Sequence, residues 1–512
     1  MEEGMDLAGW IDVQAAFAPA KTALACPGRR WTYADLAREI ARVASALAGA
    51  GVTRGDRVAH LGYNGAEQIA LLFACARLGA MFVPLSWRLA AAEHQALLAD
   101  CRPRVLVAAD PFVAPVDALP EAGTATRVAL GAPRAGWLPW ERFAAAGGPA
   151  VAPLDDAADA PVLLCYTSGS TGAPKGVVHA QDALLYNAVN SAHMHDLCSA
   201  DVVLTTLPLF HVGGLNIQTL PALHAGATVV LHPRFDPAEA VEAIVREGVT
   251  LTVLVPAQLE LLAREPGWAT ADLSRLRAIA TGSTIIDAGF VRRNLHRGVP
   301  LLQVYGATET APIAAYQRAV DAAAHPGSIG KAALHCELRV VDEAGRDAPP
   351  GASGELWVRG RNVMKGYWNR ARETAEALAG GWYRSGDIAH ADADGWLYVD
   401  GRRRDVIISG GENVYPAEIE NVLGQCPDIA EVAVVGRPDE RWGEAVVAVI
   451  VPASGRALSR DAVCALLEGR VARYKHPRDV VIADALPRTA LGKVKREELR
   501  RMAARDPLAR PA

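Results

Sequence analysis

The chain of 512 residues lacks any pair of cysteines at the CxxC spacing that structural zinc sites use, although it holds eight cysteines. Several of them lie inside apolar runs, where a reduced thiol packs as a small hydrophobic group. An excess of positive charge is also missing, since 52 Lys and Arg face 57 Asp and Glu for a net charge of −5. The cysteine spacing argues against structural zinc, and the length of 512 residues excludes a small scaffold stapled by disulfides or a metal. The charge balance gives no global electrostatic reason to bind nucleic acid.

Long uninterrupted apolar runs are missing as well. The longest run, from Ile69 to Leu85, is interrupted by Arg77. It falls short of the roughly 18–20 uncharged residues that a membrane-spanning helix needs. The first residues, MEEGMDLAGW, are acidic and carry no apolar core of signal-peptide length. We therefore expect a cytoplasmic protein without a membrane span.

What the sequence does contain is the composition of a folded protein, with 51% hydrophobic and 21% charged residues. Strand-like runs such as 162–166 and 301–305 alternate with helical patterns such as 238–247. This alternation predicts layers of an α/β fold. Past residue 335 the pattern changes to short β segments with turns, and after Gly401 to a separate α+β unit. We predict two domains, residues 1–401 and 402–512.

The segment from Tyr166 to Gly176, YTSGSTGAPKG, follows an apolar strand-like run. Its glycines and hydroxyl residues let backbone N–H groups converge on phosphate oxygens, and Lys175 adds a mobile cation. The spacing matches neither the Walker A motif nor the dinucleotide fingerprint GxGxxG. Taken alone, the segment fits both a polyphosphate-binding loop and a flexible Gly/Ser connection.

Further motifs follow in a fixed order: LPLFHVGG around His211, TGSTI from Thr281, QVYGATET from Gln303, YRSGD ending at Asp387, GRRRDVIISGGENVYPAEIE from Gly401 and PRTALGKVKR around Lys493. Over nearly the whole chain, these motifs resemble the AMP-forming acyl- and aryl-CoA synthetases of the adenylate-forming (ANL) superfamily. Among these, the motifs are most similar to benzoate-type and fatty acyl-CoA ligases. The resemblance implies a large N-terminal domain of layered α/β subdomains plus a β-rich subdomain, and a small mobile α+β C-terminal domain.

This resemblance implies an ATP-dependent acid:CoA ligase that uses ATP, Mg²⁺ and coenzyme A. The ATP site it implies consists of Thr167, Ser168, Gly169, Ser170, Thr171, Gly172, Lys175, Gly282, Ser283, Thr284, Tyr305, Gly306, Thr308, Asp387, Arg402 and Lys493. Tyr305 would face the adenine, Asp387 would accept hydrogen bonds from the ribose, and Glu309 would supply the carboxylate oxygen that a hard cation prefers. The implied catalytic residues are Lys493, Thr308, Glu309, Lys175 and His211.

Lys493 would place a cation where a carboxylate meets the α-phosphate. Electrostatic stabilisation of this kind is worth on the order of 10²–10³ in rate. His211 is not needed as a general base, because a carboxylate is already an anion at pH 7. We expect it at the wall of the acyl pocket and at the entrance of the thiol tunnel, as the resemblance implies.

The resemblance implies an acyl pocket lined by His211, Val212, Gly213, Val253, Thr281, Val304, Ala311, Pro312 and Ile313. This set holds no carboxylate or guanidinium group, which favours an apolar ring or tail over an amino acid or a dicarboxylate. Arg234 or Arg318 could still reach the pocket from loops that the sequence does not place. An o-succinylbenzoate-type ligase and an adenylation enzyme that loads a carrier protein remain alternatives.

For the second half-reaction, the resemblance implies a hinge at Arg404 and a CoA site made of Gly411, Trp442, Tyr474, Lys475 and Arg478. Gly411 would line the tunnel because a side chain there would obstruct pantetheine. An ordinary exposed basic stretch is the alternative explanation for the cations of this set. We expect small molecules as partners, with neither nucleic acid nor a membrane among them, and a homodimer as one state of assembly.

Overall fold

The computed structural model describes residues 7–148, 151, 154, 156–167, 174–283, 286, 288–294, 297–409, 412–439, 442–453, 458–468, 470–471, 473–489 and 493–504, and at 404, 412, 413 and 474 it describes the backbone only. Within these residues the chain folds into four β-sheets with helices packed on them. The predicted residues Ser168, Gly169, Ser170, Thr171, Gly172, Thr284 and Gly411 lie outside the described residues. No helix in the described part of the chain is both long and apolar enough to cross a membrane.

The first sheet of the N-terminal region has the strand order β19-β9-β8-β4-β3-β5-β6-β7. Its strands are β3 (Arg57–Leu61), β4 (Met81–Leu85), β5 (Val105–Ala109), β6 (Thr126–Leu130), β7 (Leu138–Pro139), β8 (Pro161–Thr167), β9 (Lys175–Ala180) and β19 (Gly366–Tyr367). The helices of this part of the chain are α1 (Trp10–Phe17), α2 (Tyr33–Gly49), α3 (Ala66–Leu78), α4 (Ala91–Cys101), α5 (Val113–Asp117), α6 (Trp140–Ala145) and α7 (Gln181–His195). β8 and β9 are antiparallel, with Thr167 opposite Lys175. The predicted phosphate loop therefore joins the ends of a hairpin.

The second sheet has the order β16-β15-β14-β13-β12-β10-β11-β1-β2. Its strands are β1 (Thr22–Cys26), β2 (Arg29–Thr32), β10 (Val202–Thr205), β11 (Thr228–Leu231), β12 (Leu251–Val253), β13 (Ala278–Thr281), β14 (Leu301–Tyr305), β15 (Ala315–Tyr316) and β16 (Lys331–Ala332). The strands from β11 through β10, β12 and β13 to β14 run parallel. Their carboxyl ends therefore meet at one edge of the sheet.

Helices α8 (Val212–Gly214), α9 (Leu220–His224), α10 (Pro237–Arg246), α11 (Pro256–Arg264) and α12 (Ala288–Asn294) follow strands of this second sheet. The predicted helix after Asp236 is confirmed as α10. The Asp236 carboxylate accepts a hydrogen bond of 3.0 Å from the Glu239 backbone, and Pro237 occupies the first turn, where its missing N–H costs nothing. Gly248 has φ of +63° just past the helix, a left-handed conformation that glycine adopts without strain.

The β-rich subdomain expected after residue 335 is also present. Strands β17 (Cys336–Val341), β18 (Gly354–Gly360), β20 (Tyr383–Ala391) and β21 (Leu397–Arg402) form an antiparallel sheet, and helix α13 (Ala371–Ala377) lies between β19 and β20 in the chain. In β20 and β21, Asp387 is paired with Arg402. The register of this sheet thus places two predicted nucleotide-binding residues side by side.

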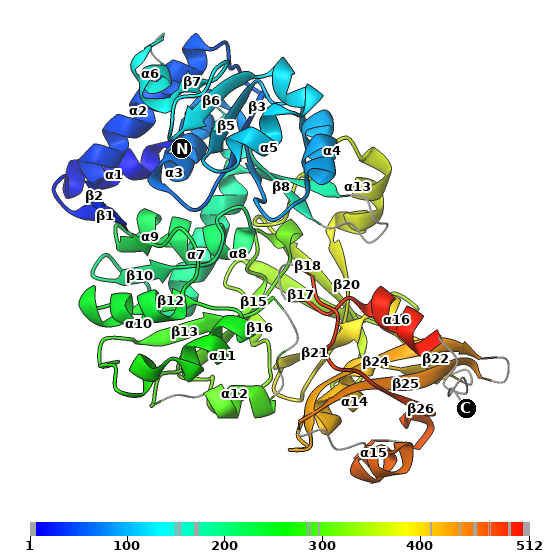
Figure 1. The fold of residues 1–512 in the computed structure, drawn as a ribbon. Helices are drawn as coiled ribbons and strands as arrows, with labels where there is room; N and C mark the ends of the chain where they lie inside the picture. The colour runs from blue at the N-terminus through cyan, green and yellow to red at the C-terminus, as the bar shows by residue number, and fades with distance from the viewer. Residues whose placement is uncertain are drawn as a thin grey trace.

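The C-terminal part forms a separate α+β lobe beside this subdomain (Figure 1). Its elements are β22 (Ile407–Ser409), β23 (Glu412–Val414), α14 (Pro416–Leu423), β24 (Ile429–Asp439), β25 (Gly443–Pro452), α15 (Arg460–Leu467), β26 (Asp479–Ile482) and α16 (Arg496–Ala504). Two apolar clusters cover the two faces of its sheet, one around Ile419 and Val446 and one around Val447 and Leu499. The predicted fold class is confirmed, while the boundary between residues 401 and 402 stays a prediction.

Candidate active site

The predicted site residues meet at the carboxyl edge of the parallel strands in the second sheet. Val253 ends β12, Thr281 ends β13 and Tyr305 ends β14, while His211 follows β10 and caps α8. Ligands of open α/β sheets bind outside the carboxyl ends of the strands. The sheet thus brings together residues that lie almost a hundred positions apart in the sequence.

Asp387, the predicted ribose-binding residue, is held by two neighbouring side chains. The Tyr305 hydroxyl donates a hydrogen bond of 2.7 Å to Asp387 Oδ2, and Arg402 Nε lies 2.9 Å from Asp387 Oδ1. The carboxylate is only 6% exposed. Its charge raises the pKa of the Arg402 guanidinium, and burial raises the pKa of the Tyr305 hydroxyl. The carboxylate is thus fixed from both sides, as an acceptor for two ribose hydroxyls should be.

Glu309 and Lys175 both contact the side chain of Tyr367. The Tyr367 hydroxyl donates a hydrogen bond of 2.8 Å to Glu309 Oε1, and the Lys175 ammonium lies 5.0 Å from the centre of the same ring. The structure thus brings the predicted metal-binding carboxylate close to the predicted phosphate-binding cation. Nothing in the sequence motifs singles out Tyr367.

Two hydrogen bonds hold the backbone that carries Thr308 and Glu309. It forms the short helix η6 (Thr308–Thr310), and His179 Nε2 donates a hydrogen bond of 2.8 Å to the Thr308 carbonyl. Burial lowers the pKa of His179 to about 4, so the ring is neutral at pH 7. The Met364 N–H donates to the Glu309 carbonyl over 2.8 Å. Hydrogen bonds from two other segments of the chain therefore hold this turn in place.

A Mg²⁺ ion bound with ATP fits this donor set. The described residues contain no group of three or more His, Cys, Asp and Glu side chains that would enclose a metal ion. Mg²⁺ is commonly held by one or two carboxylates together with substrate phosphates and water. Glu309 would supply the protein oxygen, and the ion would supply charge neutralisation between the phosphates.

Glycine is required at two predicted positions because backbones approach closely there. A Cβ on Gly306 would lie 1.3 Å from the Pro312 carbonyl oxygen, and a Cβ on Gly282 would lie 2.5 Å from the Val304 carbonyl oxygen. Ser283, next to Gly282, has φ of +72°, which is unusual for a residue with a side chain. The turns expected around the adenine are therefore shaped by backbone packing.

Five residues of the predicted acyl pocket belong to one apolar cluster: Val212, Val253, Val304, Ala311 and Ile313. Gly213 and Pro312 are buried as well. Thr281 differs, because side chains alternate along a strand and Ile279, two positions earlier, packs in the cluster with α11 and α12. Its side chain is directed to that other face, so the place of Thr281 in the pocket stays a prediction.

His211 stands at the boundary between this cluster and the C-terminal lobe. Its Nδ1 accepts a hydrogen bond of 3.0 Å from the Gly213 N–H, which leaves the proton of the neutral ring on Nε2. Burial, together with the positive charges of Lys493 and Arg88, lowers the pKa of His211 to about 4. Lys493 therefore lies within electrostatic reach of the site.

Arg88 is a further charged residue near His211 that the sequence motifs do not point to. Burial lowers the pKa of its guanidinium, which lies 4.9 Å from the Trp87 ring, and Trp87 packs edge-on against Phe210. Of the two arginines considered for the pocket, Arg318 pairs with Asp196, and Arg234 lies 6.0 Å from the ring of Tyr63.

The predicted CoA-binding side chains that the structure describes have partners within the C-terminal lobe. The Arg478 guanidinium lies 3.6 Å from the centre of the Trp442 ring, and Lys475 pairs with Glu418. Arg404 lies in the short helix η8 (Arg403–Asp405) between β21 and β22, and Tyr474 in η9 (Arg473–Lys475). A CoA adenine that stacked on Trp442 would have to share the ring with Arg478.

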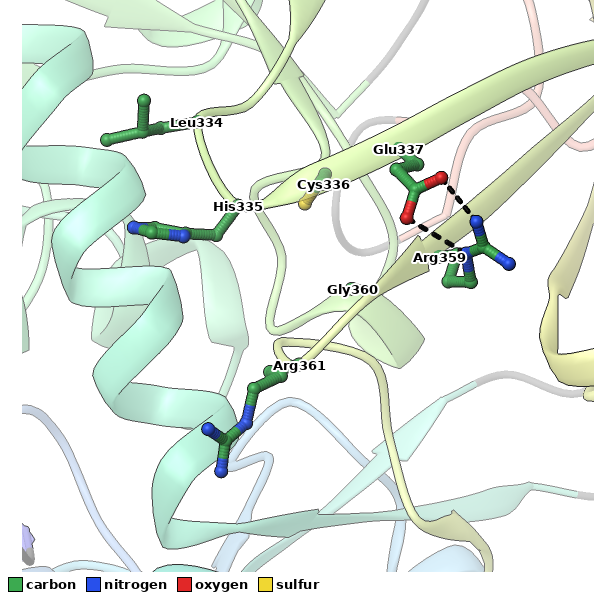
Figure 2. Close-up of a pocket in the computed structure, with 7 residues that line it drawn as sticks. All are labelled: Leu334, His335, Cys336, Glu337, Arg359, Gly360 and Arg361. Atoms are coloured by element: carbon green, nitrogen blue, oxygen red, sulfur yellow. Dashed lines mark hydrogen bonds and ion pairs between the residues drawn. The ribbon is translucent and has the colours of Figure 1, made fainter. Parts of the chain in front are cut away.

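A surface cavity of about 560 Å³ lies elsewhere, lined by Leu334, His335, Cys336, Glu337, Arg359, Gly360 and Arg361 (Figure 2). Arg359 is paired with Glu337, and the Arg361 side chain points away from that pair towards α7, where it binds Asp182. This cavity contains none of the predicted site residues.

Comparison with known proteins agrees with this site. The family model described as AMP-binding enzyme matches residues 11–368, and the AMP-binding enzyme C-terminal domain matches residues 418–493. The fold and the site define an adenylate-forming enzyme, and the chain belongs to the AMP-binding enzyme family. More particularly, it is an ATP-dependent acid:CoA ligase that works through an acyl-adenylate and uses ATP, Mg²⁺ and CoA. The predicted recognition and enzyme class are confirmed.

Two curated relatives and two solved structures are similar over almost their whole length. Indoleacetate–CoA ligase of Aromatoleum aromaticum is 56% identical, covering 98% of this chain and 99% of the relative. A feruloyl-CoA synthase of an Amycolatopsis species is 42% identical over 97% and 98% of the two chains. ATP-bound MatB of Rhodopseudomonas palustris has a TM-score of 0.89 at 30% identity, covering 98% and 99%. The anthranilate CoA ligase AuaEII with anthranoyl-AMP has a TM-score of 0.88 at 27% identity, covering 98% and 97%.

Proposed function

We propose that this ligase activates an apolar aromatic acid, with arylacetic acids as its preferred class, and transfers the acyl group to CoA. The observation that carries the proposal is that Val212, Val253, Val304, Ala311 and Ile313, which belong to the large apolar core of the N-terminal region, are all uncharged and buried, and that Tyr305, next to Val304, contacts Asp387. The names of the two relatives above, indoleacetate–CoA ligase and feruloyl-CoA synthase, support an aromatic acid.

In the first half-reaction, a carboxylate oxygen of the acid attacks the α-phosphorus of ATP. The bond from this phosphorus to the bridging oxygen breaks, and pyrophosphate leaves without a proton transfer. We assign Lys493 and Thr308 to the α-phosphate, Lys175 and the loop from Thr167 to Gly172 to the β- and γ-phosphates, and Glu309 to the cation. Cations already in place when two anions meet lower the barrier without reorganisation.

The nucleoside is held by the fixed groups of the strand edge. Asp387 accepts from the ribose hydroxyls, with Arg402 and Tyr305 orienting its two oxygens. The Tyr305 ring and the turn of Gly282, Ser283 and Thr284 enclose the adenine. Gly306 lets the strand pass close to Pro312 beneath the nucleotide.

In the second half-reaction, the CoA thiolate sulfur attacks the acyl carbonyl carbon and the bond to AMP breaks. Lys493 must leave the α-phosphate to open the route for pantetheine, and we propose a rotation of residues 402–512 about Arg404 for this step. Gly411 would line the tunnel, and Trp442, Tyr474, Lys475 and Arg478 would hold the CoA nucleotide. The neutral His211 would form the wall between acid and thiol.

Relatives named as acting on other acids keep two alternatives open. Long-chain-fatty-acid–CoA ligase FadD13 of Mycobacterium tuberculosis and 2-succinylbenzoate–CoA ligase of Geobacillus kaustophilus are each 36% identical. A fatty acid–[acyl-carrier-protein] ligase, ScoC of Streptomyces coeruleorubidus, is 39% identical and corresponds to the carrier-protein reading.

The test is the release of AMP from ATP–Mg²⁺ with arylacetic, arylacrylic, straight-chain and dicarboxylic acids, each with and without CoA. We expect the highest kcat/KM for an arylacetic acid, strict dependence on CoA for turnover, and an aryl-CoA product by mass spectrometry. A straight-chain acid as the best substrate would overturn the aromatic preference, and acyl-AMP accumulating despite CoA would support a carrier protein.

We also propose that the enzyme acts in the cytoplasm, where ATP and CoA are both supplied. A homodimer is the form of assembly we expect, and sedimentation velocity across a concentration series tests it. A single species at the mass of one chain throughout the series would contradict it.

A further inference from the structure

Tyr367 touches both the predicted metal ligand and the predicted phosphate-binding lysine. We propose that Tyr367 is a positioning residue that sets the separation between Glu309 and Lys175 for the binding of Mg²⁺–ATP. The inference deepens the proposed function and rests on its assignment of Glu309 and Lys175 to the triphosphate. It adds a residue to the reaction that none of the motifs contains.

The first contact is with Glu309. The Tyr367 hydroxyl donates a hydrogen bond of 2.8 Å to Glu309 Oε1. A tyrosine hydroxyl is protonated at pH 7, so it serves as the donor to the carboxylate. With one carboxylate oxygen engaged, the rotation of the side chain is restricted and the other oxygen is left for the cation. The backbone of Glu309 is fixed independently, by the bond from the Met364 N–H to its carbonyl.

The second contact is with Lys175. The ammonium lies 5.0 Å from the centre of the Tyr367 ring, within the range of a cation–π interaction worth about 0.5–1 kcal/mol at an exposed site. A carboxylate would hold the lysine more strongly but would cancel the charge that a phosphate requires. An aromatic face orients the cation and leaves its charge available to the nucleotide.

The position of the ring itself is determined by the sheet. β19 pairs antiparallel with β9, with Tyr367 opposite Val177, two residues after Lys175. The Tyr367 N–H donates a hydrogen bond of 2.9 Å to Thr374 Oγ1 at α13. Both contacts of the side chain therefore start from a backbone that is held at two points.

The experiment uses the full-length enzyme with Tyr367→Phe, which removes the hydroxyl and keeps the ring, and Tyr367→Leu, which removes both. Tyr186→Phe is the matched control. The Tyr186 hydroxyl also has a side-chain partner, Arg361 at 2.8 Å, and that guanidinium also lies over the ring, at 4.6 Å, but this pair borders the cavity of Figure 2. Calorimetric titration of ATP at fixed Mg²⁺ concentrations gives binding without turnover.

For Tyr367→Phe we expect the Mg²⁺ concentration that half-saturates ATP binding to rise about tenfold, the effect of losing one hydrogen bond to a charged group. ATP binding without Mg²⁺ should be unchanged in this variant and weakened in Tyr367→Leu, which also loses the ring beneath Lys175. Tyr186→Phe should match the wild type in both titrations.

A double-mutant cycle with Glu309→Gln separates positioning from a general loss of structure. Once the carboxylate is gone, Tyr367→Phe should add less than a twofold change in Mg²⁺ dependence. Independent, multiplying effects of the two substitutions would overturn the inference, as would an unchanged Mg²⁺ dependence in Tyr367→Phe. Because no acid is present, a wrong acid class leaves this result intact, whereas a wild-type enzyme whose ATP binding ignores Mg²⁺ would contradict the assigned role of Glu309 itself.

Discussion

The strand-edge site and the C-terminal lobe hold their functional side chains in different ways. At the strand edge, Asp387 is fixed by Tyr305 and Arg402, and Glu309 is fixed by Tyr367, so each carboxylate is oriented from other elements. In the C-terminal lobe, Arg478 stacks on Trp442 and Lys475 pairs with Glu418. Contacts that stay within one lobe survive when that lobe moves as a unit.

This difference corresponds to the two half-reactions. Groups that bind the nucleotide serve both steps and gain from being preorganised. Groups that alternate between steps must be carried by a part that can reorient. We propose that Lys493 belongs to the second kind, and its charge lowers the pKa of His211 at the strand edge.

The substitution Lys493→Ala is the strongest test of this difference between the strand-edge site and the C-terminal lobe. We expect acyl-AMP formation to fall by about 10²–10³-fold, because the cation at the α-phosphate is lost. Thioester formation from supplied acyl-AMP should stay within a fewfold of the wild type. Rapid-quench measurement of each half-reaction checks this. Lys495→Ala is the matched control, because that lysine pairs with Glu498 and its substitution should leave both steps unchanged. Equal losses in both steps for Lys493→Ala would contradict the proposal that Lys493 acts only in the first half-reaction.

Asp387→Asn should weaken a group that serves both steps. The amide would leave the Arg402 guanidinium without its charged partner and offer the ribose a weaker acceptor. We expect the Kd of ATP to rise about tenfold to a hundredfold, the range for hydrogen bonds to charged groups. Isothermal titration with ATP measures the change, and an effect confined to the thioester step would place Asp387 outside the nucleotide site.

Gly306→Ala tests whether the strand edge is as closely packed as the geometry requires. The new Cβ would start 1.3 Å from the Pro312 carbonyl oxygen, so the backbone must move. We expect a loss of about 1–3 kcal/mol in the free energy of unfolding, measured by urea denaturation. Gly123→Ala is the control, because a Cβ there meets no atom within 4 Å. Equal stability of the two variants would show that the contact relaxes without cost.

The smallest expected effect is on pH dependence. Burial lowers the pKa of His60, His179, His195 and His211 to about 4, whereas an unfolded histidine titrates near 6.5. As the pH falls from 6.5 towards 4, these histidines bind protons in the unfolded chain but not in the folded chain, so the free energy of unfolding decreases. The decrease is at most about 1.4 kcal/mol per histidine for each pH unit.

His390 has the opposite effect on the pH dependence of the free energy of unfolding, because its hydrogen bond to Asp400 raises its pKa. Its contribution is complete below the pKa of an unfolded histidine and is lost as the pH rises through the folded value. Burial also lowers the pKa of His94, His224 and His232. With seven lowered histidines against this one, the urea concentration at the unfolding midpoint should decrease as the pH falls from 7 to 5. A midpoint that is equal or higher at pH 5 would show that the seven histidines accept protons in the folded state.

The family and the fold class could be predicted from the sequence because they depend on local motifs, and the capping residues of α10 are read directly from Asp236, Pro237 and Gly248. QVYGATET points to Tyr305 and Glu309 as candidate nucleotide-site residues without any knowledge of their neighbours. The residues that contact these groups could not be predicted from the motifs. Tyr367 reaches Glu309 only because β19 pairs with β9 across some 190 positions, and no periodicity encodes such a pairing.

Arg88 and the stack of Arg478 on Trp442 escaped prediction for a related reason. An arginine in a loop reads as an exposed charge. Arg88 is indeed exposed, but its position over the Trp87 ring and near His211 depends on where Trp87 and Phe210 pack. In the same way, the family resemblance puts Trp442 in the predicted CoA site but does not show that the Arg478 guanidinium lies over its ring.

The central claim is that this chain forms an acyl-adenylate at the strand edge before CoA takes part. Acid-dependent exchange of labelled pyrophosphate into ATP, measured without CoA, tests it most directly. We predict exchange with an aromatic acid, none without acid, and a loss of about 10²–10³-fold in Lys493→Ala. Exchange that requires CoA, or turnover that releases ADP and phosphate in place of AMP and pyrophosphate, would contradict the account.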